Sequence, residues 1–96
     1  MGQGRDRRVQ QPGLTPFWDE LAAAGRDVPG AEVTSCDGYA RVAVDLAEVP
    51  AGVSSRTREL AESFPPDASG ERHIVIDVRN RQWLGMALEL LEGARS

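Results

Sequence analysis

Residues 72–93, RHIVIDVRNRQWLGMALELLEG, decide the fold class of this chain. The β-branched run over residues 73–78 is typical of a strand, and an apolar stripe with helical spacing follows it. Asn80 is suited to cap this helix, which we expect to span residues 80–92 and to end at Gly93. A strand that leads directly into a helix indicates an α/β domain.

A β-hairpin is predicted upstream, within residues 31–46. Asp37-Gly38 separates two strand-like runs, and both residues tolerate the positive φ of a type I′ turn. A two-residue loop fixes the register, because each strand residue then has one opposite partner. The expected pairs are Cys36 with Tyr39, Thr34 with Arg41, Val33 with Val42 and Ala31 with Val44.

Two further helices are expected. Thr15-Pro16 supplies a hydroxyl cap and a proline at the first helical position, which predicts a helix over residues 15–24. Ser54 or Ser55 can cap a second helix over residues 54–64. Gly85, within the apolar stripe of the last helix, suggests that this helix packs closely against the sheet.

The elements therefore follow one another as α-β-β-α-β-α. A helix between two strands predicts a right-handed crossover with parallel strands, so strand 72–78 is expected to run parallel to strand 39–46. The resulting fold class is α/β, in a two-layer α+β arrangement. Its three-stranded mixed sheet consists of the antiparallel hairpin 31–46 and the parallel strand 72–78, with helices 15–24, 54–64 and 80–92.

Length and composition indicate one small domain over residues 14–96. Residues 1–13 are rich in Arg, Gly and Gln and are expected to be a disordered tail. The chain has 96 residues and a formal net charge of −4, and the tail's three arginines exceed its one aspartate, which leaves −6 for the domain. This negative charge argues against nucleic-acid binding. No apolar run is long enough to span a membrane, so we expect a soluble cytoplasmic protein.

Several chemistries are excluded by residue counts. Cys36 is the single cysteine and His73 the single histidine, which rules out an internal disulfide and a metal site rich in Cys or His. All basic residues are arginines, so no lysine can form a Schiff base. This arginine bias fits a GC-rich, bacterial genome. We expect no cofactor.

The junction between strand 72–78 and the last helix is the candidate ligand site. Ligands of open parallel sheets bind beyond the carboxyl ends of the strands, and helix starts favour anions. Asp77, Arg79, Asn80 and Arg81 could therefore bind a small anion, with Asp45 of the neighbouring strand close to Asp77. In the simpler interpretation Asn80 is only a cap, the arginines are solvated, and Asp77 forms a local ion pair.

Other candidate sites are weaker. Cys36 with His73 and an aspartate could form a nucleophilic set, but the two residues lie at different strand ends, so we assign no catalytic residues. The pairs Glu59–Glu62 and Glu89–Glu92 are interpreted as solvated helix faces. Finally, the adjacent Phe17 and Trp18 cannot both point fully inward, so they either belong to the core or form a partner-binding patch.

The layout of residues 39–94 is similar to the front part of STAS-type anti-sigma-antagonist domains. The resemblance rests on DLAEVP, the helix after it, HIVIDV and the last helix. It implies a phosphorylatable serine after an aspartate, just beyond the strand that matches residues 73–78. That place reads RNRQWLG here, without Ser or Thr, and the final strand and helix of the family are missing.

The sequence therefore favours a small, acidic, non-enzymatic domain that binds another protein, as an immunity protein, inhibitor or regulatory subunit does. An acidic surface accelerates association with a basic partner. One alternative is a small-anion binder or enzyme that uses the junction after strand 73–78. Another is a homo-oligomer, such as a homodimer, that pairs through the hairpin edge 31–36.

Overall fold

The computed structural model describes residues 17–95, which form three helices and a three-stranded antiparallel sheet. In chain order the elements are α2 (Trp18–Gly25), β1 (Ala31–Cys36), β2 (Tyr39–Leu46), α3 (Ser55–Glu62), β3 (Arg72–Val78) and α4 (Arg81–Arg95). This α-β-β-α-β-α succession is the expected one. The tail 1–13 and the proposed cap at Thr15 lie outside the described residues.

The hairpin register is confirmed. β1 and β2 are antiparallel, and the partners include Cys36 with Tyr39 and Ala31 with Val44. Gly38 has a φ of 85°, the left-handed conformation that the tight turn requires and that glycine adopts without steric cost.

The parallel orientation predicted for strand 72–78 is wrong. β3 pairs antiparallel with β2, so that Leu46 lies opposite Arg72 and Ala40 lies opposite Val78. A parallel crossover would require the connection to run back along the whole of β2. α3 instead packs against α4, and the chain re-enters the sheet at the end where it left.

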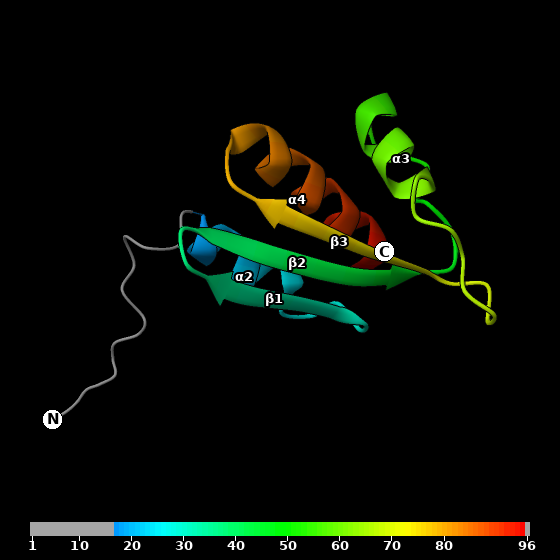
Figure 1. Ribbon diagram of the computed structural model, residues 1–96, viewed down its shortest axis with the longest axis horizontal. Coiled ribbons are helices and arrows are strands. Elements are labelled where there is room, and N and C mark those ends of the chain that lie inside the picture. The colour runs from blue at the N-terminus through cyan, green and yellow to red at the C-terminus, as the bar shows by residue number, and fades with distance from the viewer. Residues whose placement is uncertain (1–16, 96) are drawn as a thin grey trace, which may run out of the picture.

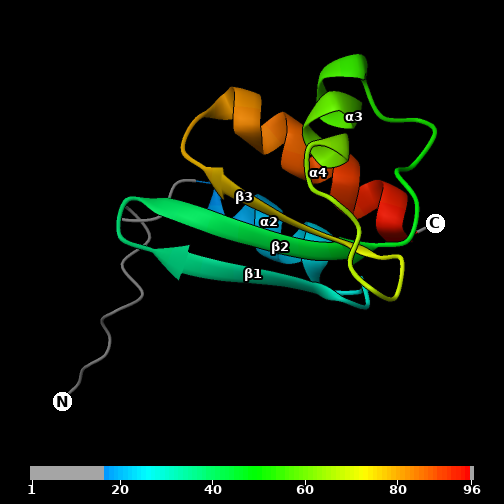
Figure 2. The same ribbon diagram turned by 45° about the vertical axis from the view of Figure 1, so that its right-hand side comes forward.

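The molecule has two layers. α2 lies behind the sheet in Figures 1 and 2, α4 is seen above β3 and packs against β3 and β2, α3 lies beside α4, and the front face of the sheet has no helix over it. The side chains of β2, and of residues 74–78 of β3, that point back toward the helices are buried, whereas those of β1 that point the same way are half-buried or exposed. The side chains that point forward are exposed or half-buried in all three strands. The sheet contributes Ala40, Val42, Val44, Leu46, Ile74, Ile76 and Val78 to the core, and α4 contributes Leu84, Ala87, Leu90 and Leu91.

Helix ends follow the predicted capping chemistry in two cases. The hydroxyl of Ser54 accepts a hydrogen bond from the backbone N–H of Thr57 at 3.3 Å, and Oδ1 of Asn80 accepts one from the N–H of Trp83 at 3.1 Å. These bonds satisfy N–H groups that the helices themselves leave without partners.

The roles expected for two glycines of α4 are wrong. Gly93 does not end the helix, which continues to Arg95; it lies against Pro50, and a Cβ added to it would come within 2.5 Å of the proline ring. Gly85, expected at a close contact with the sheet, is exposed and has nothing within 4 Å of where its Cβ would be. The close approach of α4 to another element is therefore at Gly93, against the loop before α3. At position 85 there is room for a side chain.

Among residues 17–95, no helix combines the length and the apolar character that crossing a bilayer demands.

Candidate functional site

The uncovered face of the sheet carries several interacting polar side chains. We call this surface the sheet face. It consists of Glu32, Thr34 and Cys36 of β1, Tyr39, Arg41, Ala43 and Asp45 of β2, and His73, Val75 and Asp77 of β3, with Arg79 directly after β3. These residues share one face because alternate side chains of a strand point to the same side.

Arg41 and Asp77 form an ion pair on this face. The antiparallel register places them opposite each other, and Nε and Nη2 of Arg41 donate to Oδ1 and Oδ2 of Asp77 at 2.8 and 3.4 Å. These hydrogen bonds lower the pKa of Asp77 below its ordinary value, and the nearby charge of Arg79 acts in the same direction. They also raise the pKa of Arg41. Both side chains are therefore charged at neutral pH.

Tyr39 is an aromatic platform for two arginines. The guanidinium carbon of Arg79 lies 4.0 Å from the centre of the Tyr39 ring, and that of Arg41 lies 5.9 Å away. Nη2 of Arg41 also donates to the Tyr39 hydroxyl at 3.4 Å. The close contact with Arg79 has the geometry of a cation–π interaction. It holds the Arg79 side chain against the ring of Tyr39, the first residue of β2.

A second polar pair lies toward the other end of the same two strands. Nδ1 of His73 is 2.5 Å from Oδ1 of Asp45, and the register places these residues opposite each other. Both side chains are largely exposed, at 65% and 43%. Between the two polar pairs, Ala43 faces Val75, and both are half-buried. The sheet face therefore has an apolar centre with a polar pair on each side.

The four residues of the predicted anion site do not converge on one point. Asp77 binds Arg41, Arg79 stacks on Tyr39, and the side chain of Asn80 caps α4. The guanidinium of Arg81 lies 5.8 Å from the ring of Phe17. All four side chains thus have partners, and each has a different one.

The expected proximity of Asp45 and Asp77 is wrong. It followed from a parallel sheet, in which the ends of both strands lie at the same edge. In the antiparallel sheet Asp45 lies opposite His73, at the start of β3, and Asp77 lies opposite Arg41, toward its end. Each carboxylate has a basic partner in place of the other carboxylate.

Cys36 and His73 are held at different ends of the sheet. Cys36 lies opposite Tyr39 at the hairpin end, whereas His73 lies opposite Asp45 near the far end of β2. The imidazole therefore cannot activate the thiol directly. Within residues 17–95, no three His, Cys, Asp or Glu side chains come together as metal ligands would.

Phe17 and Trp18 stand at the start of α2, and both are half-buried. Phe17 packs against the hydrophobic core and has a φ of 66°, a left-handed conformation that side chains other than glycine rarely adopt. α2 itself packs against α4 and β1.

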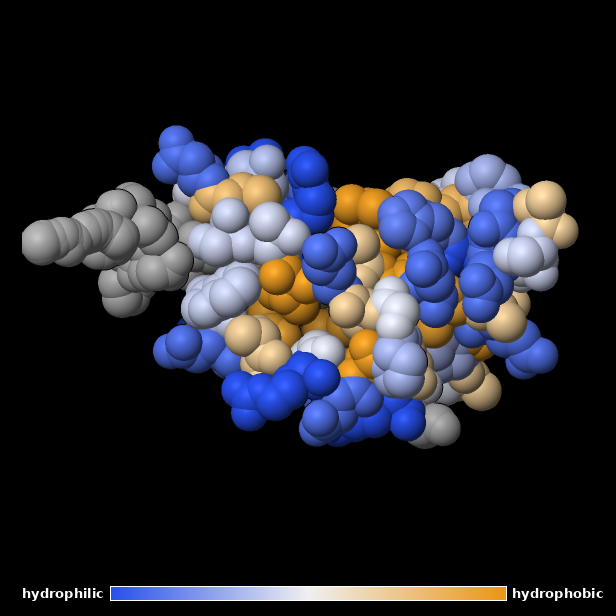
Figure 3. Space-filling view, turned by 90° about the horizontal axis from the view of Figure 1, so that it is seen from below, coloured by the Kyte–Doolittle hydropathy of each residue, from blue (hydrophilic) through white to orange (hydrophobic). Residues whose placement is uncertain are grey.

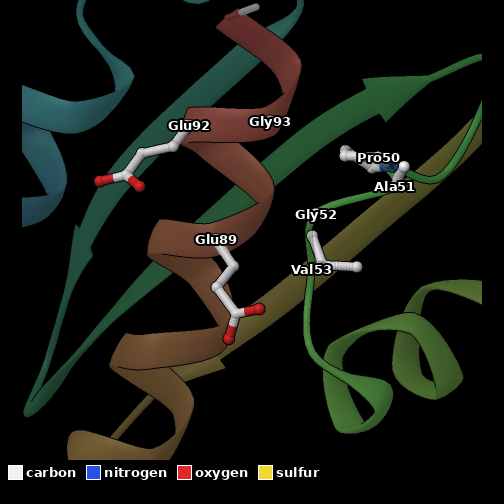
Figure 4. A pocket seen from close by; sticks show the side chains of 7 residues that line it. All are labelled: Pro50, Ala51, Gly52, Val53, Glu89, Glu92 and Gly93. Atoms are coloured by element: carbon white, nitrogen blue, oxygen red, sulfur yellow. The ribbon is translucent and has the colours of Figure 1, made fainter.

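A hollow of about 400 Å³ lies between the loop before α3 and the C-terminal half of α4. It is lined by Pro50, Ala51, Gly52, Val53, Glu89, Glu92 and Gly93 (Figure 4). The two carboxylates point to different sides of α4, that of Glu89 toward the start of α3 and that of Glu92 away from the loop. They therefore do not form a paired acid site.

Glu89 is not a solvated residue of the outer helix face, as the sequence suggested. It accepts hydrogen bonds from the backbone N–H and the hydroxyl of Ser54, at 2.5 and 3.2 Å, and from the hydroxyl of Thr57 at 3.1 Å. Thr57 is fully buried. Glu89 thus joins α4 to the start of α3, where a carboxylate also interacts favourably with the helix dipole.

Sequence reasoning missed the pairs Arg41–Asp77 and Asp45–His73 and the stacking of Arg79 on Tyr39. The residue types were visible, but their partners depend on the direction of β3. An antiparallel register in which Val42 faces Ile76 would have predicted both pairs directly.

No family model, no curated protein and no solved structure matches this chain.

Proposed function

We propose that this chain is a non-enzymatic protein-interaction domain whose binding surface is the sheet face. The observation that carries the proposal is the uncovered side of the sheet, where an apolar centre at Ala43 and Val75 lies between two polar pairs. An apolar centre with a polar rim is the usual anatomy of a protein interface. Tyrosine and arginine, here Tyr39, Arg41 and Arg79, are the residue types that most often dominate binding energy.

The charge of the chain indicates the chemistry of the partner. Residues 17–95 contain eight arginines and fourteen acidic residues, a formal net charge of −6. Long-range attraction therefore favours a basic protein, which would approach faster than a neutral one. The partner would place an apolar side chain over Val75 and polar groups near Arg79 and Asp45.

The small-anion alternative receives less support. An anion site needs several donors that point at one position, and a guanidinium stacked on an aromatic ring is already oriented by that ring. Arg79 is stacked in this way, and the Asn80 side chain is used by Trp83. A thermal-shift screen with phosphorylated and carboxylated metabolites tests this alternative. A rise in melting temperature that is lost in Arg79→Ala and Arg81→Ala would favour it over a protein partner.

Affinity capture with matched variants tests the proposed function. The immobilised chain is exposed to an extract of the source organism, beside Arg79→Glu on the sheet face and Glu59→Gln on the exposed side of α3. We expect a protein in stoichiometric amount on the wild type and on Glu59→Gln but not on Arg79→Glu. If nothing is retained in stoichiometric amount, or if Arg79→Glu retains the same protein equally well, the sheet face is not the binding surface.

A further inference from the structure

We infer that two copies of this chain pair antiparallel through the outer edges of their β3 strands, with Val75 at the two-fold axis. β3 is the last strand of the sheet order β1-β2-β3. On its outer side, residues 17–95 supply a backbone partner only at Arg72, which is bridged by Pro66. Residues 73–78 therefore present an edge that a further strand can join.

This edge lacks two devices that commonly prevent edge-to-edge pairing. Its sequence, RHIVIDV, contains no proline, and its seven residues pair with β2 in an unbroken register, without a bulge. Edge strands that remain monomeric are commonly interrupted by one of these. Residues 73–77 are therefore free of both interruptions.

The polar side chains of β3 on the sheet face are complementary in reverse order. An imidazole, which can donate a hydrogen bond, and a carboxylate, which accepts one, lie at equal distances on either side of Val75. In a two-fold antiparallel pair, each residue lies opposite the one at the same distance beyond the axis. With the axis at Val75, His73 faces Asp77 of the second copy, and Asp77 faces His73 of the second copy. Val75 faces its own equivalent, so the centre is apolar. Opposite partners of this kind stabilise a sheet, whereas like charges destabilise it.

Neighbouring registers lose this complementarity. An axis at Ile74 would place Glu71 opposite Asp77 of the second copy, which are like charges. An axis at Ile76 would place His73 opposite Arg79, which are both basic. Of the three registers with the axis at Ile74, Val75 or Ile76, the sequence of β3 therefore favours the one with the axis at Val75.

The pairs within each copy extend the same pattern across the dimer. In one row of a six-stranded sheet, Asp45 would be followed by His73, then by Asp77 and Arg41 of the second copy, so acidic and basic groups alternate. Nδ1 of His73 lies 2.5 Å from Oδ1 of Asp45, which leaves Nε2 for a second carboxylate. Beside this row, Ala43 and Val75 of both copies would form one continuous apolar strip.

The other edge of the sheet carries no such pattern. Glu32 is the sole charged residue of β1, so no axis within residues 31–36 places opposite charges across from each other. Seen from below, the side on which β1 lies in Figure 1, hydrophobic atoms gather near the middle among hydrophilic residues (Figure 3). Apolar contact alone would not select a register there. Self-association is therefore assigned to β3 and not to the hairpin edge 31–36.

Charge variants at the axis test this inference, because position 75 would face itself. Val75→Glu and Val75→Lys should each place like charges opposite each other and convert a dimer to a monomer in analytical ultracentrifugation. An equimolar mixture of the two should form a dimer again, now between unlike copies. Thr34→Glu and Thr34→Lys, on the exposed side of β1, are the matched controls and should leave the wild-type dimer intact.

A wild type that stays monomeric at the highest concentration measured would overturn the inference. A dimer that persists in Val75→Glu, or a mixture that remains monomeric while both variants are folded by circular dichroism, would also overturn it. If either charge variant does not fold, crosslinking decides in its place. Val75→Cys in a Cys36→Ser background should form an intermolecular disulfide readily, because directly opposite residues lie within disulfide range. Thr34→Cys in the same background should not, and equal crosslinking of both contradicts the inference.

This inference goes beyond the proposed function and can fail separately. Pairing uses the edge of β3, whereas the proposed binding to another protein uses the sheet face and is tested through Arg79. A monomer that still retains a partner through Arg79 would overturn the dimer alone.

Discussion

Gly93 of α4 lies directly against the ring of Pro50, close enough that a Cβ on Gly93 would come within 2.5 Å of the Cβ and Cγ atoms of the proline. No pair of real side chains adopts such a distance, so the loop before α3 can approach α4 only because position 93 has no side chain. One turn earlier in α4, Glu89 accepts hydrogen bonds from Ser54 and Thr57 at the start of α3. The position of α3 therefore depends on two contacts with the C-terminal half of α4.

Gly93→Ala should destabilise the protein. The added methyl group must displace Pro50, and overpacking of this kind costs about 1–3 kcal/mol. The higher helix propensity of alanine offsets up to about 1 kcal/mol of this cost. We expect a net loss of roughly 1–2 kcal/mol in the free energy of unfolding, measured by urea denaturation.

Gly85→Ala is the matched control in the same helix. Position 85 is exposed and has open space where a Cβ would be. Only the backbone entropy of glycine is removed, so the free energy of unfolding should rise by about 0.5–1 kcal/mol. Equal effects of the two substitutions would mean that Pro50 does not pack against Gly93 in solution.

Glu89→Ala should loosen α3. The substitution removes the acceptor for the N–H of Ser54 and for the hydroxyl of the buried Thr57. Loss of a capping carboxylate with a buried donor costs about 1–2 kcal/mol. In hydrogen exchange, the amides of α3 should lose protection more than those of β2. Glu59→Ala, on the exposed side of α3, should change stability by less than about 0.5 kcal/mol.

Tyr39→Ala should lower stability through its arginine partners, and Tyr39→Phe should not. Arg79 lies 4.0 Å from the ring centre, and such contacts contribute about 0.5–1 kcal/mol at exposed sites. Phenylalanine keeps the ring and loses only the 3.4 Å hydrogen bond from Arg41. If Phe and Ala reduce the free energy of unfolding equally, the hydroxyl and not the ring carries the contribution of Tyr39.

Local signals predicted much of the fold. Asp37-Gly38 determined the hairpin and its register, since a two-residue loop leaves one pairing, and Ser54 and Asn80 cap the helices that follow them. These features depend on a few adjacent residues.

The direction of β3 could not be read in the same way. It depends on where α3 packs, and α3 packs on α4 through contacts made by residues such as Glu89 that are far away in sequence. The general preference for parallel crossovers concerns connections that carry the chain back along the preceding strand, whereas residues 47–71 return it to the end of β2 where it left. The predicted proximity of Asp45 and Asp77 was wrong for the same reason, because the direction of β3 determines which residues lie opposite each of them.

The Arg41–Asp77 pair predicts a specific dependence of stability on pH. The pKa of Asp77 is lowered in the folded protein, chiefly by its hydrogen bonds from Arg41, relative to an unfolded value of about 3.9. The pair therefore contributes fully above the unfolded pKa, and its contribution is lost as pH falls through the lower folded pKa. Asp77→Asn should reduce the free energy of unfolding at pH 7 but make little difference at strongly acidic pH.

In Arg41→Gln, the carboxyl carbon of Asp77, followed by NMR, should titrate at a higher pH than in the wild type. Added salt should shrink the difference between wild type and Asp77→Asn, since both partners are partly exposed. A deficit of Asp77→Asn that is constant from neutral to acidic pH would show that the Asp77 carboxylate does not stabilise the fold through its charge.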